Sequence, residues 1–241
     1  MNKTKKILLI LLVVFILIML GVGILIVSFF QGMKADSEEE KKAIALAEPY
    51  LQQHFQAETT IVDVLYDNMG NWGYFDYAAK VRHEQDGTEF LVYHNQETNQ
   101  MEDTYIASKW EDDAEKDIQP YVEQQLGTSI TGREIRKFAD RNDWDEIQEK
   151  MEGKIEVGVY FDEDEVKQLQ IDPNFPGNYT NYDVAPTIRI TIPRSKLETD
   201  EGQFHELISL FQEKVVAHGT LVVHYSDMGV PLEEDEWSKS F

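Results

Sequence analysis

An unbroken apolar run near the N-terminus constrains this chain more than any other feature. Residues 7–30 read ILLILLVVFILIMLGVGILIVSFF and contain no charged side chain. A helix rises about 1.5 Å per residue, so this run reaches about 36 Å, enough to cross a hydrocarbon core of about 30 Å. A helix also satisfies its backbone hydrogen bonds internally, as lipid requires. The run therefore predicts a single transmembrane helix that contacts the lipid bilayer through residues 7–30.

A cleaved signal peptide is the alternative interpretation of this run. Its apolar region spans about 7–15 residues and ends in a small-x-small cleavage site. The run here is longer, and residues 31–35, QGMKA, form a poor site, so we expect an uncleaved anchor. Lysines at positions 3, 5 and 6 precede the run and acidic residues dominate after it. The positive-inside rule therefore predicts a cytoplasmic N-terminus and an extracellular C-terminal domain in the cell membrane.

The rest of the chain is acidic and contains no cysteine. The formal net charge is −23, and a surface of this sign repels nucleic acid, which is itself a polyanion. We therefore expect neutral or basic partners and no nucleic acid. The absence of cysteine excludes a disulfide scaffold, a thiol nucleophile and a cysteine-ligated zinc site. An exported domain of this composition is typical of the Gram-positive cell envelope.

Helical and strand patterns follow one another after the anchor and predict an α+β fold. A helix is expected from Ser37, with a kink or break at Pro49. Strands are then expected at 60–66, 74–81, 89–94 and 101–106, with a hairpin turn at Asp86-Gly87. These four strands would form an antiparallel meander beside the helix.

The second half of the chain predicts a comparable set of elements. We expect helices at 109–126, 143–151 and 203–217, and strands at 129–138, 154–161, 187–192 and 220–225. Pro49-Tyr50-Leu51 is echoed by Pro120-Tyr121-Val122, which favours two tandem helix-plus-antiparallel-sheet modules. The expected organisation is a cytoplasmic stub at 1–6, the transmembrane helix at 7–30, a first module at 31–107, a second at 108–230 and a loose acidic tail at 231–241.

Residue types that carry catalysis or bind metals form no recognised pattern. The chain has no Gly-x-Ser-x-Gly elbow, no His-Glu-x-x-His frame and no glycine-rich phosphate loop. His83 and His94 flank the Asp86-Gly87 turn, where ordinary surface histidines are expected. The acidic runs 140–146 and 162–165 lack the spacing of an EF-hand and are interpreted as solvated turns. We predict no metal and no cofactor, although 45 acidic residues leave open a carboxylate pair for glycoside cleavage.

An aromatic loop at residues 174–182 is the candidate binding surface. It carries Phe175, Tyr179 and Tyr182 among asparagine, proline and glycine residues. Exposed aromatic side chains on a loop are common in protein-binding patches. The alternative is that the three rings cover the adjoining sheet.

Two short motifs in residues 43–122 resemble a group of uncharacterised membrane-anchored or lipoprotein ectodomains of Gram-positive bacteria. They are Ala47-x-x-Tyr50-Leu51 in the first helix, and Tyr105-Ile106-Ala107-x-Lys109-Trp110 leading into a helix near Pro120. The resemblance implies small cystatin-like or PepSY-like α+β modules on the cell surface, and it brings no catalytic residue. The chain departs from the lipoprotein members because it has no cysteine.

These observations together predict a non-enzymatic, membrane-anchored binding protein of the cell envelope. Its partner would be another envelope or extracellular protein, for example in a secretion or toxin-immunity system. Two alternatives are an envelope hydrolase with paired carboxylates and a structural spacer subunit.

Overall fold

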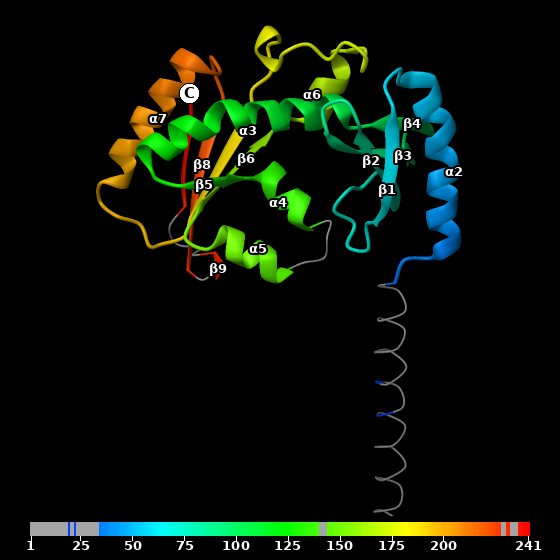
Figure 1. Ribbon diagram of the computed structural model, residues 1–241, viewed down its shortest axis with the longest axis horizontal. Coiled ribbons are helices and arrows are strands. Elements are labelled where there is room, and N and C mark those ends of the chain that lie inside the picture. Colours follow the sequence, from blue (N-terminus) through cyan, green and yellow to red (C-terminus); the bar gives the residue numbers. More distant parts are fainter. Residues whose placement is uncertain (1–18, 20–21, 23–33, 140–143, 228–229, 232–235) are drawn as a thin grey trace, which may run out of the picture. The chain divides into compact units, whose positions relative to one another are not determined.

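The computed structural model describes residues 34–139, 144–227, 230–231 and 236–241, together with Met19 and Val22 (Figure 1). The expected anchor at residues 7–30 thus lies almost entirely outside the described residues. Among the residues that are described, no helix is both long and apolar enough to cross a membrane. The described residues form an α+β fold with two sheets, which confirms the expected fold class.

The chain divides into two compact units, each assembled from separate stretches of sequence. Unit 1 contains residues 1–52, 61–81 and 91–102, and unit 2 contains residues 53–60, 82–90 and 103–241. The module boundaries expected at 31–107 and 108–230 stay a prediction.

Unit 1 contains most of helix α2 and most of a four-stranded sheet, and the ends of these elements at residues 53–54, 59–60, 82–83, 89–90 and 103 belong to unit 2. The elements are α2 (Ser37–His54), β1 (Thr59–Tyr66), β2 (Tyr77–His83), β3 (Glu89–Asn95) and β4 (Gln100–Asp103). The strand order is β1-β2-β3-β4. The links between neighbours are too short for the crossover of a dozen or more residues that parallel strands need. The expected antiparallel meander is therefore confirmed.

Helix α2 begins at an aspartate and continues through a proline. The Asp36 side chain accepts a hydrogen bond from the Glu38 backbone N–H at 2.8 Å, so Asp36 caps a helix that begins at Ser37 as expected. The expected break at Pro49 is wrong, since α2 runs on to His54. Pro49 and Ala45 are both exposed, so water can reach the carbonyl that the missing proline N–H leaves unbonded.

Unit 2 contains the second sheet with its helices. The strands are β5 (Ser129–Thr131), β6 (Ile155–Tyr160), β7 (Thr187–Ile192), β8 (Thr220–Asp227), β9 (Val230–Pro231) and β10 (Trp237–Ser240). The helices are α3 (Tyr105–Gln125), α4 (Gly132–Ala139), α5 (Trp144–Met151), α6 (Glu163–Gln168) and α7 (Asp200–Lys214), with a 3-10 turn at Tyr179–Asn181.

The second sheet is mixed, so the expectation of a purely antiparallel second module is wrong. Its order is β10-β8-β7-β6-β5, with β9 on β8. The pairs β5–β6 and β7–β8 are parallel, whereas β6–β7 and β8–β10 are antiparallel. Helix α7 provides the crossover between β7 and β8 that a parallel pair requires.

The main hydrophobic core lies between this sheet and helices α3 and α7 (Figure 1). Alternate residues of β7, Ile188, Ile190 and Ile192, are all buried, as expected for a strand with one face on a core. Trp110 of α3 and Phe204 of α7 are fully buried in the same core. This large apolar core explains how the acidic chain folds without disulfides.

Two segments of unit 2 differ from their expected structure because a cap starts a helix. The strand expected at 129–138 ends at Thr131, where α4 begins. Thr131 and Glu134 exchange hydrogen bonds: the Thr131 N–H donates to Glu134 Oε2 at 2.9 Å, and the Glu134 N–H donates to Thr131 Oγ1 at 3.2 Å. This is a capping box. The acidic run 162–165 likewise starts α6, with Asp162 accepting from the Glu165 N–H at 2.9 Å.

The end of the chain is a strand, so the expectation of a loose tail is wrong for residues 237–240. Strand β10 pairs antiparallel with β8, and Trp237 lies opposite Val223. The Trp237 ring lies against Phe204, with 5.1 Å between ring centroids. Burial of this ring against the core stabilises the strand. Residues 232–235 of the expected tail lie outside the described residues.

Candidate functional site

The aromatic loop presents one ring to solvent, not three. Phe175 is 71% exposed, whereas Tyr179 is only 2% exposed and donates a hydrogen bond to Asp117 at 2.9 Å. Tyr182 is half-buried and lies on Trp110, with 4.8 Å between ring centroids. The exposure expected of Tyr179 and Tyr182 is therefore wrong, because both rings cover the core of unit 2. A binding role for the loop stays a prediction that now concerns Phe175.

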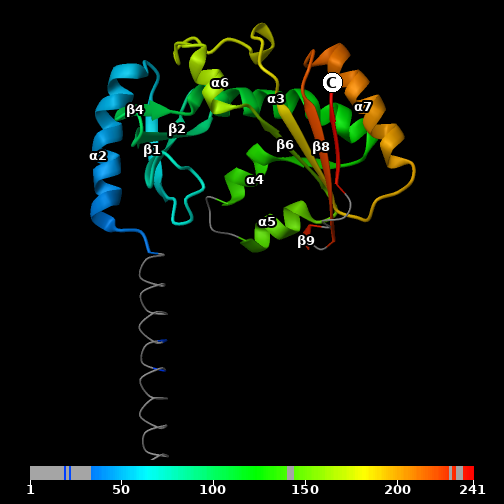
Figure 2. The same ribbon diagram turned by 180° about the vertical axis from the view of Figure 1, so that it is seen from behind.

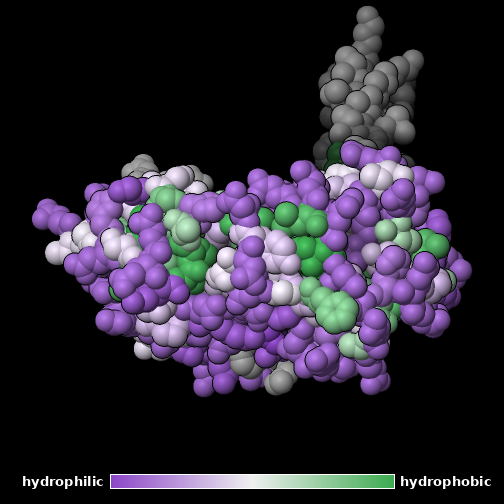
Figure 3. Space-filling model, turned by 90° about the horizontal axis from the view of Figure 1, so that it is seen from above, coloured by the Kyte–Doolittle hydropathy of each residue, from purple (hydrophilic) through white to green (hydrophobic). Residues whose placement is uncertain are grey.

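The face of the molecule drawn in Figure 3 is largely hydrophilic. In the view of Figure 3, hydrophobic side chains gather in small separate patches among polar ones. Single exposed apolar residues are normal on soluble domains and do not by themselves mark a binding site. A candidate site for a ligand or for a side chain of a partner therefore requires a hollow as well as exposed apolar side chains.

The two histidines of the β2–β3 hairpin region have different surroundings. His83 is buried, and its Nδ1 lies 3.0 Å from Asp86 and 3.3 Å from the Tyr105 hydroxyl. Tyr105 also donates to Asp86 at 2.9 Å, and its pKa is raised by burial and by the Asp86 carboxylate. His94 is half-buried in unit 1. Within the described residues, no group of three or more metal-binding side chains is found.

Helix α3 carries a cluster of buried carboxylates that pair with two arginines of α4. Asp112 accepts from Arg133 Nη1 at 2.7 Å and from Arg136 Nη2 at 2.8 Å. Glu115 accepts from the Arg133 backbone N–H at 2.8 Å. Burial raises the pKa of Glu115 to about 7, although Arg136 and the Arg133 N–H lower it. Burial also raises the pKa of Glu111 to about 8.

This carboxylate cluster has no room for a substrate. The adjoining cavity, lined by Gly87, Glu89, Asp112, Arg133, Arg136 and Lys137, measures about 10 Å³. Such a volume holds about one water molecule, whereas a glycosidase must place a sugar ring between its two carboxyl groups. The contacts of the cluster are those of a network that joins α3 to α4, and they give the alternative of a hydrolase no support.

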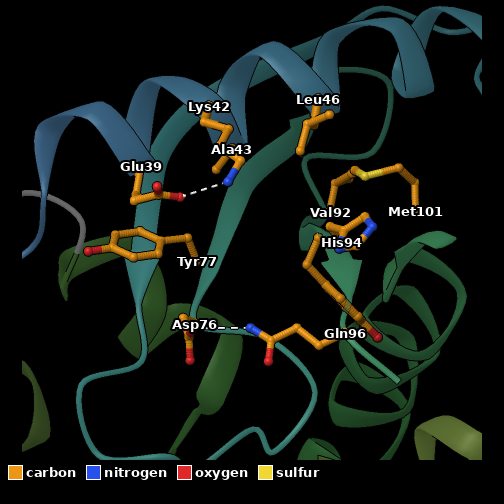
Figure 4. Close-up of a pocket in the computed structure, with 11 residues that line it drawn as sticks. Glu39, Lys42, Ala43, Leu46, Asp76, Tyr77, Val92, His94, Gln96 and Met101 are labelled. Atoms are coloured by element: carbon orange, nitrogen blue, oxygen red, sulfur yellow. Dashed lines mark hydrogen bonds and ion pairs between the residues drawn. The ribbon is translucent and has the colours of Figure 1, made fainter. Parts of the chain in front are cut away.

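A hollow between α2 and the sheet is the candidate functional site. It measures about 120 Å³ and lies entirely within unit 1 (Figure 4). We call it the α2 groove, and it is lined by Glu39, Lys42, Ala43, Leu46, Asp76, Tyr77, Val92, Tyr93, His94, Gln96 and Met101. Its residues come from one face of α2 and from β2, β3 and the start of β4, together with Asp76 just before β2 and Gln96 just after β3.

Helix and strand periodicity explains why these side chains meet. Glu39, Lys42, Ala43 and Leu46 are spaced three or four apart, so they share one side of α2. Val92 and His94 alternate along β3 and therefore point to the same face of the sheet. In Figure 4 these side chains converge from the helix and from the strand.

The α2 groove combines apolar surface with a polar rim. Ala43, Leu46, Val92 and Met101 supply the apolar part, and Leu46 remains 39% exposed. On the rim, Lys42 Nζ lies 3.2 Å from a Glu39 carboxylate oxygen. The Gln96 amide donates to Asp76 at 3.1 Å. The groove can therefore bury an apolar group while carboxylates stand beside it.

The volume of the α2 groove limits the size of a ligand. A cavity of about 150 Å³ takes one benzene ring, and pockets for drug-sized ligands measure about 300–1,000 Å³. The α2 groove therefore fits one apolar side chain of a partner better than a whole cofactor or sugar. On the opposite side of α2, a wider hollow of about 280 Å³ is lined by residues such as Ile44 and Val62.

Sequence reasoning missed the α2 groove, although one signal was present. The first helix carries Ile44, Leu46, Ala47 and Leu51, yet only Ala47 and Leu51 are buried. A helix that carries more apolar residues than it buries has apolar surface left to contact a partner.

Comparisons with known proteins bring no further information on the site. No family model, no curated protein and no solved structure matches this chain.

Proposed function

We propose that this chain is a non-enzymatic binding protein of the cell envelope, anchored in the membrane by residues 7–30. The α2 groove is its binding site. The observation that carries the proposal is a half-exposed leucine, Leu46, that lines a hollow large enough for one apolar side chain of a partner. Buried apolar anchors of this kind contribute most of the binding energy at protein interfaces.

The sequence and the domain order support the anchor. The charge-free run 7–30 is long enough to span a bilayer. The folded part begins with α2 at Ser37, only a few residues after the run. Lysines stand before the run and acidic residues after it, so unit 1 and unit 2 would both lie outside the cell.

The partner is proposed to be an extended segment of another envelope or extracellular protein, as in a secretion or toxin-immunity system. An aliphatic side chain of the segment enters the groove beside Leu46 and Met101. A neighbouring lysine or arginine of the segment lies near the carboxylates of Glu39 and Asp76. The net charge of −23 favours such a basic segment and speeds its approach.

A peptide-display selection against the full chain in nanodiscs tests the groove. We expect the selected peptides to combine one aliphatic residue with an adjacent lysine or arginine. Leu46→Arg fills the groove with a charged side chain and should abolish their binding. The matched control is Leu197→Arg, because Leu197 is a leucine of unit 2 that is 52% exposed and does not line the groove. Peptides that bind the Leu46→Arg variant as well as the parent would refute the site.

Cysteine labelling on intact cells tests the topology. The chain has no native cysteine, so a single introduced cysteine reports its own location. A membrane-impermeant maleimide should label Leu197→Cys on intact cells and should label Asn2→Cys only after the cells are opened. The reverse pattern, or release of the folded part into the medium, would contradict the anchor.

A further inference from the structure

The loop between β1 and β2, residues 67–76, has an exposed apolar tip. Met69 at this tip is 81% exposed, the highest value among the large apolar side chains described as exposed. Trp72 and Tyr74 are half-buried beside it. Trp and Tyr favour the headgroup layer of a bilayer, where their rings meet both apolar and polar surroundings.

Hydrogen bonds hold the β1–β2 loop in one conformation. The Asp67 carboxylate accepts from the Trp72 N–H at 2.7 Å, from the Met69 N–H at 3.3 Å and from Asn71 Nδ2 at 3.3 Å. The Asp67 N–H donates to the Asp76 carbonyl at 2.8 Å, which closes the loop at its base. Trp72 stacks on Phe75 with 5.5 Å between ring centroids. The tip is thus presented by a rigid support.

The loop lies at the same end of unit 1 as the start of α2. The Asp36 N–H, just before α2, donates to the Tyr77 hydroxyl at 2.8 Å, and Tyr77 directly follows the loop. Figures 1 and 2 show the β1–β2 connection and the first turn of α2 at one end of this unit in both views. The chain therefore reaches this end of unit 1 directly after residues 31–35.

The short spacer keeps this end of unit 1 close to the bilayer. From Phe30 to Asp36 a fully extended chain covers at most about 20 Å. The headgroup layer on each side of the hydrocarbon core is about 5–8 Å thick. A unit that is tethered so closely meets the headgroups with the end from which the tether enters.

We propose that the tip of the β1–β2 loop inserts Met69 into the headgroup layer of the membrane that holds residues 7–30. The inference rests on the proposed anchor and adds a second contact with the bilayer. Two contacts orient unit 1, because a single flexible tether leaves a domain free to turn. Asp36 and Glu38 at this end would repel anionic headgroups, so the contact is expected from apolar insertion of Met69 and not from charge.

Single-cysteine fluorescence on the full chain in phosphatidylcholine nanodiscs tests this contact. Met69→Cys, Gln52→Cys and Leu17→Cys each carry an environment-sensitive NBD label; Gln52 is exposed and lies in unit 1 near the other end of α2. Nitroxide-bearing phosphatidylcholine quenches labels in the bilayer, and iodide quenches labels in water. We expect the lipid quencher to quench position 69 strongly and position 52 hardly at all. Iodide should show the opposite order.

The label at position 17 shows whether a negative result concerns the loop contact alone or the anchor as well. Quenching at position 17 by lipid nitroxide, with position 69 quenched only by iodide, would overturn the loop contact and leave the anchor standing. No lipid quenching at position 17 would overturn the anchor and the loop contact together. Asn68→Cys, next to Met69 in the same loop and also exposed, provides a second label that leaves Met69 and the side chain of Asn71 in place. Its label should be quenched by lipid nitroxide as strongly as the label at position 69.

Discussion

Helices α2 and α3 share a short sequence motif but have different surroundings. Pro49-Tyr50-Leu51 in α2 and Pro120-Tyr121-Val122 in α3 show the same order of exposure: the proline is exposed, the tyrosine half-buried and the aliphatic residue buried. Each motif lies in the C-terminal part of its helix. The shared motif therefore gives the same order of burial in both helices.

The difference lies in how much of each helix its unit covers. Helix α2 buries Ala47 and Leu51 only. Helix α3 buries Tyr105, Ala107, Trp110, Asp112, Ala114, Glu115, Ile118 and Val122. A helix that buries little leaves hollows beside it for a partner, whereas a helix enclosed on several sides contributes to stability. The contrast in burial supports the proposal that α2 serves binding, whereas α3 serves stability, and four measurements test it.

The largest effect is expected from Trp110→Ala in α3. Trp110 is fully buried and contacts Phe161 and Tyr182, so its removal should cost about 3–5 kcal/mol of unfolding free energy. Leu51→Ala in α2 should cost less, about 2 kcal/mol, since hollows flank that helix. Urea unfolding of the full chain in detergent measures both. Equal losses would remove the distinction between the helices.

Arg133→Met tests the ion pairs that α3 makes. The variant leaves the buried Asp112 with Arg136 alone and should cost about 3 kcal/mol. Lys41→Met is the control in α2, because Lys41 pairs with Glu38 at 2.8 Å with both side chains well exposed. An exposed pair of this kind contributes at most about 0.5 kcal/mol. A small loss for Arg133→Met would show that the network is not needed for stability.

The pH dependence of stability tests the same network. Burial raises the pKa of Glu115 to about 7, so the folded chain holds a proton that the unfolded chain releases near pH 4.5. The stabilisation is complete below pH 4.5 and is lost as the pH rises through about 7, by about 1–3 kcal/mol. Glu115→Gln should make this part of the profile less steep, and the slope that remains is expected from Glu111, whose pKa burial raises to about 8. An unchanged slope in thermal unfolding from pH 5 to 8 would contradict the assignment.

The smallest effect on stability is expected from Leu46→Arg in α2. Leu46 is already 39% exposed, and an arginine can lie along the groove with only its charged end in water, so the unfolding free energy should change by less than about 0.5 kcal/mol. The same variant is expected to lose peptide binding. A large loss of stability would mean that Leu46 belongs to the core and would weaken the proposal for the groove.

Periodicity in the sequence predicted the strands that lie in the core. The strand expected at 187–192 is β7 with the same bounds, because alternating isoleucines have only one way to face a core. The capping box Thr131-Gly132-Arg133-Glu134 could also have been recognised, and it would have corrected the strand expected at 129–138. The mixed pairing of the second sheet could not, because alternation is the same in parallel and antiparallel strands.

The candidate site likewise has features that local sequence predicts and features that it does not. Composition indicates that Tyr179 and Tyr182 lie on a loop, but only the tertiary structure brings Asp117 and Trp110 to them and so removes them from the surface. The hollow beside Leu46 depends on where α2 lies over the strands, which no local pattern encodes.

The order of residues along the chain is enough to predict the α+β class, the alternation of the core strands and an anchor in the charge-free run. All three are local properties, since they depend on hydropathy read over a few neighbouring residues. The folded chain is needed to see which apolar residues remain exposed, which carboxylates are buried beside arginines and where a groove forms. These properties depend on residues far apart in the chain, and burial and volume exist only once those residues meet.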